Sequence, residues 1–110
     1  MTSILDDIKH VLGILPENTA FDQDVIIFTN SALSILTQLN VGPEQGFEIT
    51  GYSEVWEDFI DDKRLNAVKS YVYLRVRLLF DPPTTGYTTT AFAQQITELE
   101  YRLNVVADYG

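Results

Sequence analysis

The stretch from Leu65 to Pro83, LNAVKSYVYLRVRLLFDPP, constrains the fold of this chain more than any other stretch. An α-helix turns about 100° per residue, so the apolar residues of this stretch cover roughly 200° of a helical surface. A helix that is apolar over so wide an arc must be covered on two sides, by other parts of the chain or by a partner. Asp81 precedes Pro82, and the residue before a proline is disfavoured in helical conformation, so we expect the helix to end near Phe80.

Arg75 lies within the apolar arc, among Val68, Val72 and Leu79. Burying a guanidinium is strongly unfavourable unless the charge is paired. We therefore predict that Arg75 forms a buried ion pair. Its carboxylate partner belongs either to the same chain, for example in the acidic segment 54–62, or to a neighbouring subunit.

The remaining sequence predicts helices around this central one and no sustained strand. The first helix is expected to have Ser3 as its N-cap and to run towards Gly13, and the second to run from Asp22 or Asp24, as cap, to Leu39. A short helix is expected to start after Ser53, and the last helix at Thr89 or Thr90. In the last of them, apolar residues recur in steps of three and four, which predicts a seam against another helix: Phe92, Ile96, Leu99, Leu103 and Val106.

We therefore predict an all-α fold, a small bundle of four to five helices with a long central helix and one irregular loop at about residues 40–52. The 110 residues suffice for a single domain with a modest core. The tail at about residues 104–110 is expected to be either flexible or a docking segment.

The charge is acidic and unevenly distributed. Residues 1–62 hold twelve acids against Lys9 alone, a net charge of −11, whereas residues 63–110 hold six bases and four acids, a net charge of +2. So acidic a chain should repel a phosphate backbone. The asymmetry suits head-to-tail contact between copies, although acids that merely keep the first half soluble would give the same pattern.

The sequence offers no set of residues for catalysis, a cofactor or a metal. There is no cysteine and only one histidine, His10, so no standard zinc set exists. Asp22 and Asp24 resemble the start of a calcium loop, but Ile26, Phe28 and Asn30 fill the later ligand positions in a helical pattern, so the match fails. No apolar run approaches the roughly 18 residues of a membrane span. We expect neither an enzyme nor a membrane partner, and take a soluble intracellular product as the default.

Lys69, Tyr73 and Arg77 share the polar side of the central helix, with Lys63 and Arg64 just before it. These residues allow two interpretations. One is a nucleic-acid-binding surface with Tyr73 as a stacking group. The other, favoured by the overall charge, is a solvated or partner-facing ridge.

Four segments, in order, carry a resemblance that covers nearly the whole chain: FDQDVIIFTNSALSILTQLNVG, WEDFI, YVYLRVRLLFDPP and FAQQITELEYRLNV. The most specific part runs from Lys69 through LRVRLLFDPP to ITELEYRLNV. In this order the chain resembles the head–tail connector proteins (adaptor, or head-completion, proteins) of long-tailed bacteriophages and prophages.

The resemblance implies a structural protein of the virion, located at the head–tail interface and assembled in the bacterial cytoplasm. Such proteins form a ring, dodecameric in the virion, beneath the portal protein. The ring extends the DNA channel, lets DNA pass without specific binding, and offers a platform for stopper or tail-completion proteins.

The resemblance also makes the loop at 43–52 and both termini candidates for subunit, portal or lumen contacts. The suspected interface residues are Lys69, Tyr73, Arg77, Phe47, Ile49 and Tyr109. Two other classes remain as alternatives: a small helical adaptor or regulatory subunit of a phage or host system, and, less favoured, a nucleic-acid-binding protein.

Overall fold

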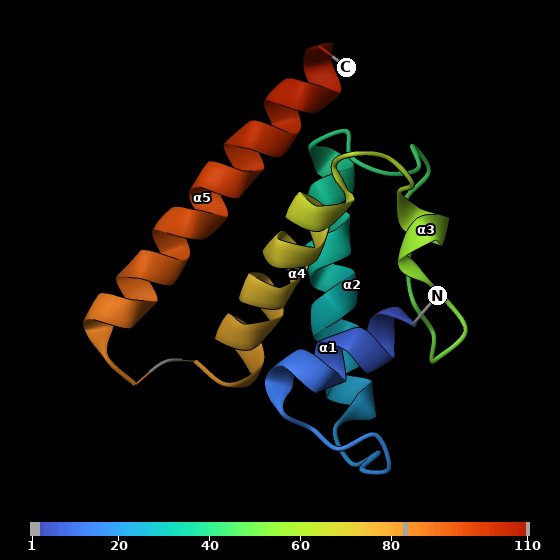
Figure 1. The fold of residues 1–110 in the computed structure, drawn as a ribbon, viewed down its shortest axis with the longest axis vertical. Coiled ribbons are helices and arrows are strands. Elements are labelled where there is room, and N and C mark those ends of the chain that lie inside the picture. Colours follow the sequence, from blue (N-terminus) through green and yellow to red (C-terminus); the bar gives the residue numbers. More distant parts are fainter. Residues whose placement is uncertain (1–2, 83, 110) are drawn as a thin grey trace.

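A computed structural model describes residues 3–82 and 84–109, with side chains as far as Val105. The chain folds into the helices α1 (Ile4–Leu12), α2 (Asp22–Gln38), α3 (Trp56–Phe59), α4 (Leu65–Phe80) and α5 (Gly86–Tyr109) (Figure 1). Within these described ranges there is no strand beyond an isolated bridge between Ser3 and Val55. The prediction of an all-α bundle of four to five helices is confirmed.

Helix α4 is the central element, as its wide apolar arc predicts. It packs against α2 on one side and α5 on another, and α1 touches both α2 and α4. Val68, Tyr71, Val72 and Val76 of α4 are fully buried. In Figure 1, α5 forms one flank of the molecule, and α3 lies on the opposite side. The helix ends at Phe80 with Asp81 as its C-cap, as predicted; Pro83 lies outside the described residues.

The apolar seam of α5 is used inside the chain. Ile96 and Leu103 are buried, and Leu99 packs against the same core. This seam therefore gives no evidence for contacts between copies, because α4 already covers it.

The last helix is longer at both ends than expected. It starts at Gly86, and the hydroxyl of Thr85 accepts a hydrogen bond from the Thr88 N–H (3.3 Å), so Thr85 serves as the cap instead of Thr89 or Thr90. At the other end α5 continues to Tyr109, through the segment expected to be a tail.

Only one of the earlier cap predictions is confirmed. The Ser3 hydroxyl accepts a hydrogen bond from the Asp6 N–H (2.9 Å), as predicted. Helix α2 has Phe21 at its N-cap and no side-chain cap bond, so neither predicted aspartate caps it. Helix α3 starts later than Ser53 predicts, with Val55 as its N-cap. None of the described helices combines the length and apolar character of a membrane span.

Candidate functional site

The irregular loop between α2 and α3, one of the candidate contact regions, is held in place by polar contacts. The side-chain amide of Asn30 on α2 forms two hydrogen bonds with the backbone of Ile49. Its Oδ1 accepts from the Ile49 N–H (2.7 Å), and its Nδ2 donates to the Ile49 carbonyl (3.0 Å). A pair of hydrogen bonds of this kind fixes a loop against a helix without a strand.

Ile49 itself is only 1% exposed and belongs to the core. The sequence suggested this side chain as an interface residue, and the structure does not support that assignment. Its neighbour Phe47 is half-buried and meets the ring of Phe59 edge-on, with 5.5 Å between centroids. Alternation along FEIT thus places one apolar residue in the core and the other at its margin.

Glu54 braces the end of the same loop. Its carboxylate accepts hydrogen bonds from the Thr50 N–H (3.1 Å), the Thr50 hydroxyl (2.7 Å) and the Gly51 N–H (3.4 Å). Burial acts to raise the pKa of Glu54, but these hydrogen bonds outweigh it and the pKa lies below its ordinary value. Glu54 therefore helps to hold the loop in a fixed shape.

A buried lysine joins three separate segments near this loop. Lys9 of α1 is 1% exposed. Its ammonium lies 2.9 Å from Oδ1 of Asp22 and donates to the Tyr52 hydroxyl (2.8 Å) and the Pro16 carbonyl (3.2 Å). The Tyr52 hydroxyl in turn donates to the other oxygen of Asp22. We call Lys9, Asp22 and Tyr52 the lysine cluster.

The charges of the lysine cluster stabilise one another. Burial acts to lower the pKa of Lys9, but hydrogen bonds to Tyr52 and Asp22 outweigh it and raise that pKa. Burial acts to raise the pKa of Asp22, but hydrogen bonds from Tyr52 and Lys9 hold it below its usual range. The hydrogen bond to Asp22 raises the pKa of Tyr52. The cluster is therefore a charged pair with a neutral tyrosine at neutral pH.

Sequence reasoning missed this cluster. Lys9 and His10 follow each other on a short amphipathic helix, and a lysine there normally reaches solvent. The sequence holds one signal that Lys9 is paired: it is the only lysine or arginine among the first 62 residues, which hold twelve acids. That imbalance marks Lys9 as a residue with many possible partners but does not select Asp22.

Two of the suspected contact residues on α4 pack against Trp56 of α3. The rings of Tyr73 and Trp56 meet edge-on at 5.9 Å, and the ammonium of Lys69 lies 5.8 Å from the Trp56 ring centre. Trp56 is 1% exposed, as expected for a core residue, and its Nε1 donates to Asp7 (2.8 Å). Burial, helped by the charge of Asp7, raises the pKa of Tyr73 to about 12.

Arg75 pairs with an acid of the same chain, one of the two predicted alternatives, but its burial and the position of that acid differ from the prediction. Its Nη1 lies 3.7 Å from Oε2 of Glu100, and the two side chains are 32% and 31% exposed, so the pair is only partly buried. Its acid comes from α5 and not from segment 54–62. The guanidinium also lies over the ring of Tyr71, at 5.9 Å. Tyr71 is the buried member of this group and donates to Glu100 (2.6 Å).

The other suspected residues lie apart. Arg77 donates to the Asp81 carbonyl (3.0 Å) and is 41% exposed, so part of its side chain remains available. Tyr109 ends α5, and its side chain lies outside the described part of the chain. The structure thus brings Lys69 and Tyr73 of α4 together against Trp56 of α3 but does not unite the suspected residues in one site.

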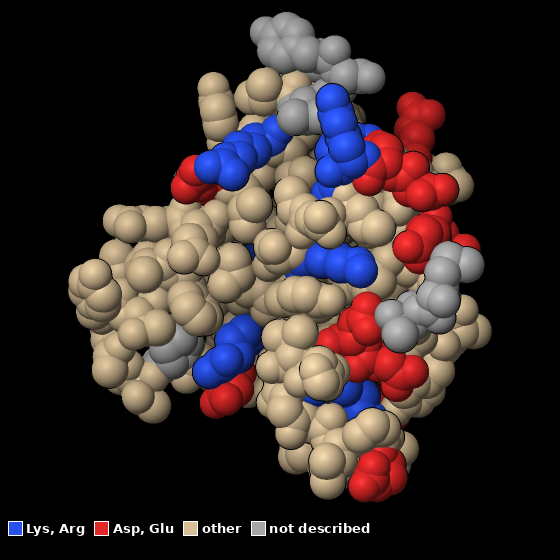
Figure 2. Space-filling view, viewed as in Figure 1, with Lys and Arg blue, Asp and Glu red and all other residues tan. Residues whose placement is uncertain are grey.

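On the face drawn in Figure 2, the bases do not form one continuous basic surface. Arg64 pairs with Asp62 (2.9 Å), and Arg102 with Glu98. Figure 2 shows the basic side chains of this face separated from one another, with acids gathered on the side of α1 and α3. This distribution does not favour the nucleic-acid interpretation. Among the described residues no cluster of histidine or acidic side chains could hold a metal ion.

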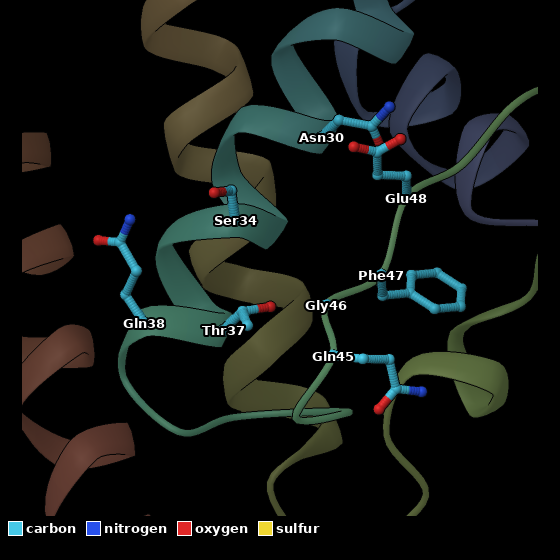
Figure 3. A pocket seen from close by; sticks show the side chains of 8 residues that line it. All are labelled: Asn30, Ser34, Thr37, Gln38, Gln45, Gly46, Phe47 and Glu48. Atoms are coloured by element: carbon cyan, nitrogen blue, oxygen red, sulfur yellow. The ribbon is translucent and has the colours of Figure 1, made fainter.

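A polar groove of about 540 Å³ opens between α2 and the loop. Figure 3 shows the segment 45–48 running alongside α2, with Phe47 pointing away from that helix. Five uncharged polar residues line it together with a glycine, a phenylalanine and one acid: Asn30, Ser34, Thr37, Gln38, Gln45, Gly46, Phe47 and Glu48. Amides and hydroxyls of this kind bind by hydrogen bonding and supply no acid–base pair for catalysis.

The comparisons with known proteins address the identity of the chain. Neither the curated proteins nor the solved structures contain a match. Among protein families, residues 4–110 match the family described as "Phage connector protein", a structural and non-enzymatic family of phage particles. The match covers all five helices and the loop between α2 and α3. The chain therefore belongs to the phage connector protein family.

Proposed function

We propose that this chain is the head–tail connector, or adaptor, of a long-tailed phage or prophage. Copies of the chain form a ring beneath the portal protein, extend the DNA channel, and offer the docking platform for stopper or tail-completion proteins. The family match over residues 4–110 is the observation that carries this proposal.

Two physical features support the adaptor role. The loop between α2 and α3 is held by Asn30, Glu54 and the lysine cluster, so its shape is defined before a partner binds. A pre-formed surface loses less conformational entropy on binding than a mobile one. The net charge of −9 also suits a channel wall past which DNA must slide without adhering.

Lys69, Arg77, Phe47 and Tyr109 remain proposed contacts with the portal or with neighbouring copies. Part of the Arg77 side chain is exposed, and Lys69 and Phe47 are half-buried at the margin of the core. Tyr73 is a weaker candidate, because its ring already packs against Trp56.

Removing this chain from the phage that encodes it tests the proposal. We expect full-length tails and DNA-filled heads that do not join, and normal particles when the wild-type chain is supplied in trans. Particles of normal yield and infectivity without the chain would contradict it. A chain with an adaptor or regulatory role outside the particle would instead be absent from purified virions.

A further inference from the structure

Two helices expose long faces that carry no charge. The first face, the α5 outer stripe, consists of exposed residues in steps of three and four: Tyr87, Thr90, Gln94, Thr97 and Tyr101. The second, the α2 outer stripe, consists of Gln23, Ile27, Ser31, Ser34 and Gln38. Such steps keep each stripe on one side of its helix, opposite the buried residues.

The absence of charge is unusual for solvent-facing helices. Residues 86–97 and 25–43 contain no Asp, Glu, Lys or Arg, although 21% of the chain is charged. The outer face of a helix in water normally carries charges, whereas the centre of an interface is depleted in them. Tyr87, Tyr101 and Ile27 are 87%, 71% and 54% exposed, and large side chains of this kind are typical anchors of interfaces.

We propose that the α5 outer stripe of one copy packs along the α2 outer stripe of the next copy. The inference rests on the proposed ring and assigns the surfaces that build it. The two stripes match in length, since Tyr87 to Tyr101 and Gln23 to Gln38 each span about 21–23 Å at the helical rise of 1.5 Å per residue. Neither stripe has a charged member, and Glu98, which borders the α5 outer stripe, is paired with Arg102. Contact between the stripes themselves therefore places no charged side chain at its centre, whereas a charged partner would lose solvation there.

The polar groove adds a second element of complementarity. It shares Ser34 and Gln38 with the α2 outer stripe, and its volume of about 540 Å³ leaves space for a projecting side chain such as Tyr101. The side chains of Ser34, Gln38 and Tyr101 make no hydrogen bond within the described part of the chain. Their hydrogen-bonding groups are therefore available to a partner.

A contact between two different surfaces joins the copies head to tail. Each copy uses its α5 outer stripe on one neighbour and its α2 outer stripe on the other. Such head-to-tail contacts produce a ring when the rotation closes, whereas a self-complementary contact stops at a dimer.

One arginine placed in each stripe tests the assignment, because both positions are exposed and the fold should tolerate the change. Thr97→Arg blocks α5, Ser31→Arg blocks α2, and Ser70→Arg on the exposed side of α4 is the matched control. Sedimentation velocity over a concentration series measures assembly, and circular dichroism checks that each variant is folded. We expect Thr97→Arg and Ser31→Arg each to weaken self-association at least about tenfold, and Ser70→Arg to leave it unchanged.

Mixing the two blocked variants gives the sharper result. Each still has one intact stripe, so the mixture should form a dimer of twice 12.5 kDa and nothing larger. The chain has no cysteine, so a Thr97→Cys, Ser31→Cys double variant can also be cross-linked with a bis-maleimide. A ladder of dimers, trimers and larger species is expected, and a Thr97→Cys, Ser70→Cys pair should give none.

Three outcomes would overturn the inference. The first is cross-linking of chains that carry Thr97→Cys alone. The second is a wild-type chain that stays monomeric together with a Thr97→Cys, Ser31→Cys variant that gives no ladder. The third is loss of portal binding by Thr97→Arg with unchanged self-association. Binding to the portal protein of the same phage is measured in parallel. Portal binding without a ladder would remove this inference and leave the proposed function standing, whereas loss of both would remove both.

Discussion

Replacing Asp22 by asparagine should lower the free energy of unfolding more than replacing an exposed surface residue does. Lys9 and Asp22 have side-chain exposures of 2% and 17%, so the lysine would keep its charge inside the core without a counter-charge. Breaking a buried pair in this way costs about 3–5 kcal/mol. Asparagine still accepts a hydrogen bond and Asp22 is partly exposed, so we expect the lower end, about 3 kcal/mol. In a domain of this size the melting temperature should fall by roughly 10–20 °C.

The matched control is Asp24→Asn, which makes the same chemical change two residues further along α2 at an exposed position without a partner in the described part of the chain. It should change stability by less than about 0.5 kcal/mol. Urea denaturation followed by far-ultraviolet circular dichroism measures both variants. Equal stability of the two variants at neutral pH would refute the role given to the lysine cluster.

The pH dependence tests the same reasoning through its sign. The pKa of Asp22 is lower in the folded chain than its ordinary value, so the stability from its charge is present at neutral pH. That stability is lost as the pH falls through the folded pKa. The difference between wild type and Asp22→Asn should therefore shrink below about pH 4. A difference that stays constant into acid would show that the charge is not responsible.

Three further changes follow from single contacts. Gly42→Ala should destabilise the chain by at least about 2 kcal/mol in urea denaturation, because φ is +84° and a Cβ would lie 2.5 Å from the Phe59 ring; wild-type stability would be inconsistent with this turn. Arg75→Ala should cost less than about 1 kcal/mol, since its pair with Glu100 is one third exposed; a loss of several kcal/mol would mean full burial. Asn30→Ala should cost about 2 kcal/mol and speed amide exchange in the loop, and unchanged exchange would count against the clamp.

The elements of the fold could be predicted because each has a local cause. Alternating three- and four-residue steps mark the buried sides of α4 and α5, and Asp81 before Pro82 marks the end of α4. Ser3 caps α1 as its position predicts. Signals of this kind lie within a few residues of one another, so they can be read without the tertiary structure.

The partners of charged side chains could not be predicted in the same way. Asp22 looks like a helix cap in sequence, but its carboxylate is held by Lys9 and Tyr52, thirteen residues before it and thirty residues after it. Arg75 finds Glu100 on the next helix instead of an acid in segment 54–62. Ile49 looks like a loop residue open to a partner and lies in the core. Each of these outcomes depends on how distant segments pack, which spacing along the chain does not specify.

The proposed role as a head–tail connector is tested most directly by the binding of this chain to the portal protein encoded in the same phage genome, measured by native mass spectrometry of the purified complex. We expect a defined complex with one copy of the chain per portal subunit, formed by wild type and Ser70→Arg alike. A portal that remains bare in the presence of excess folded chain would show that the chain is not the connector.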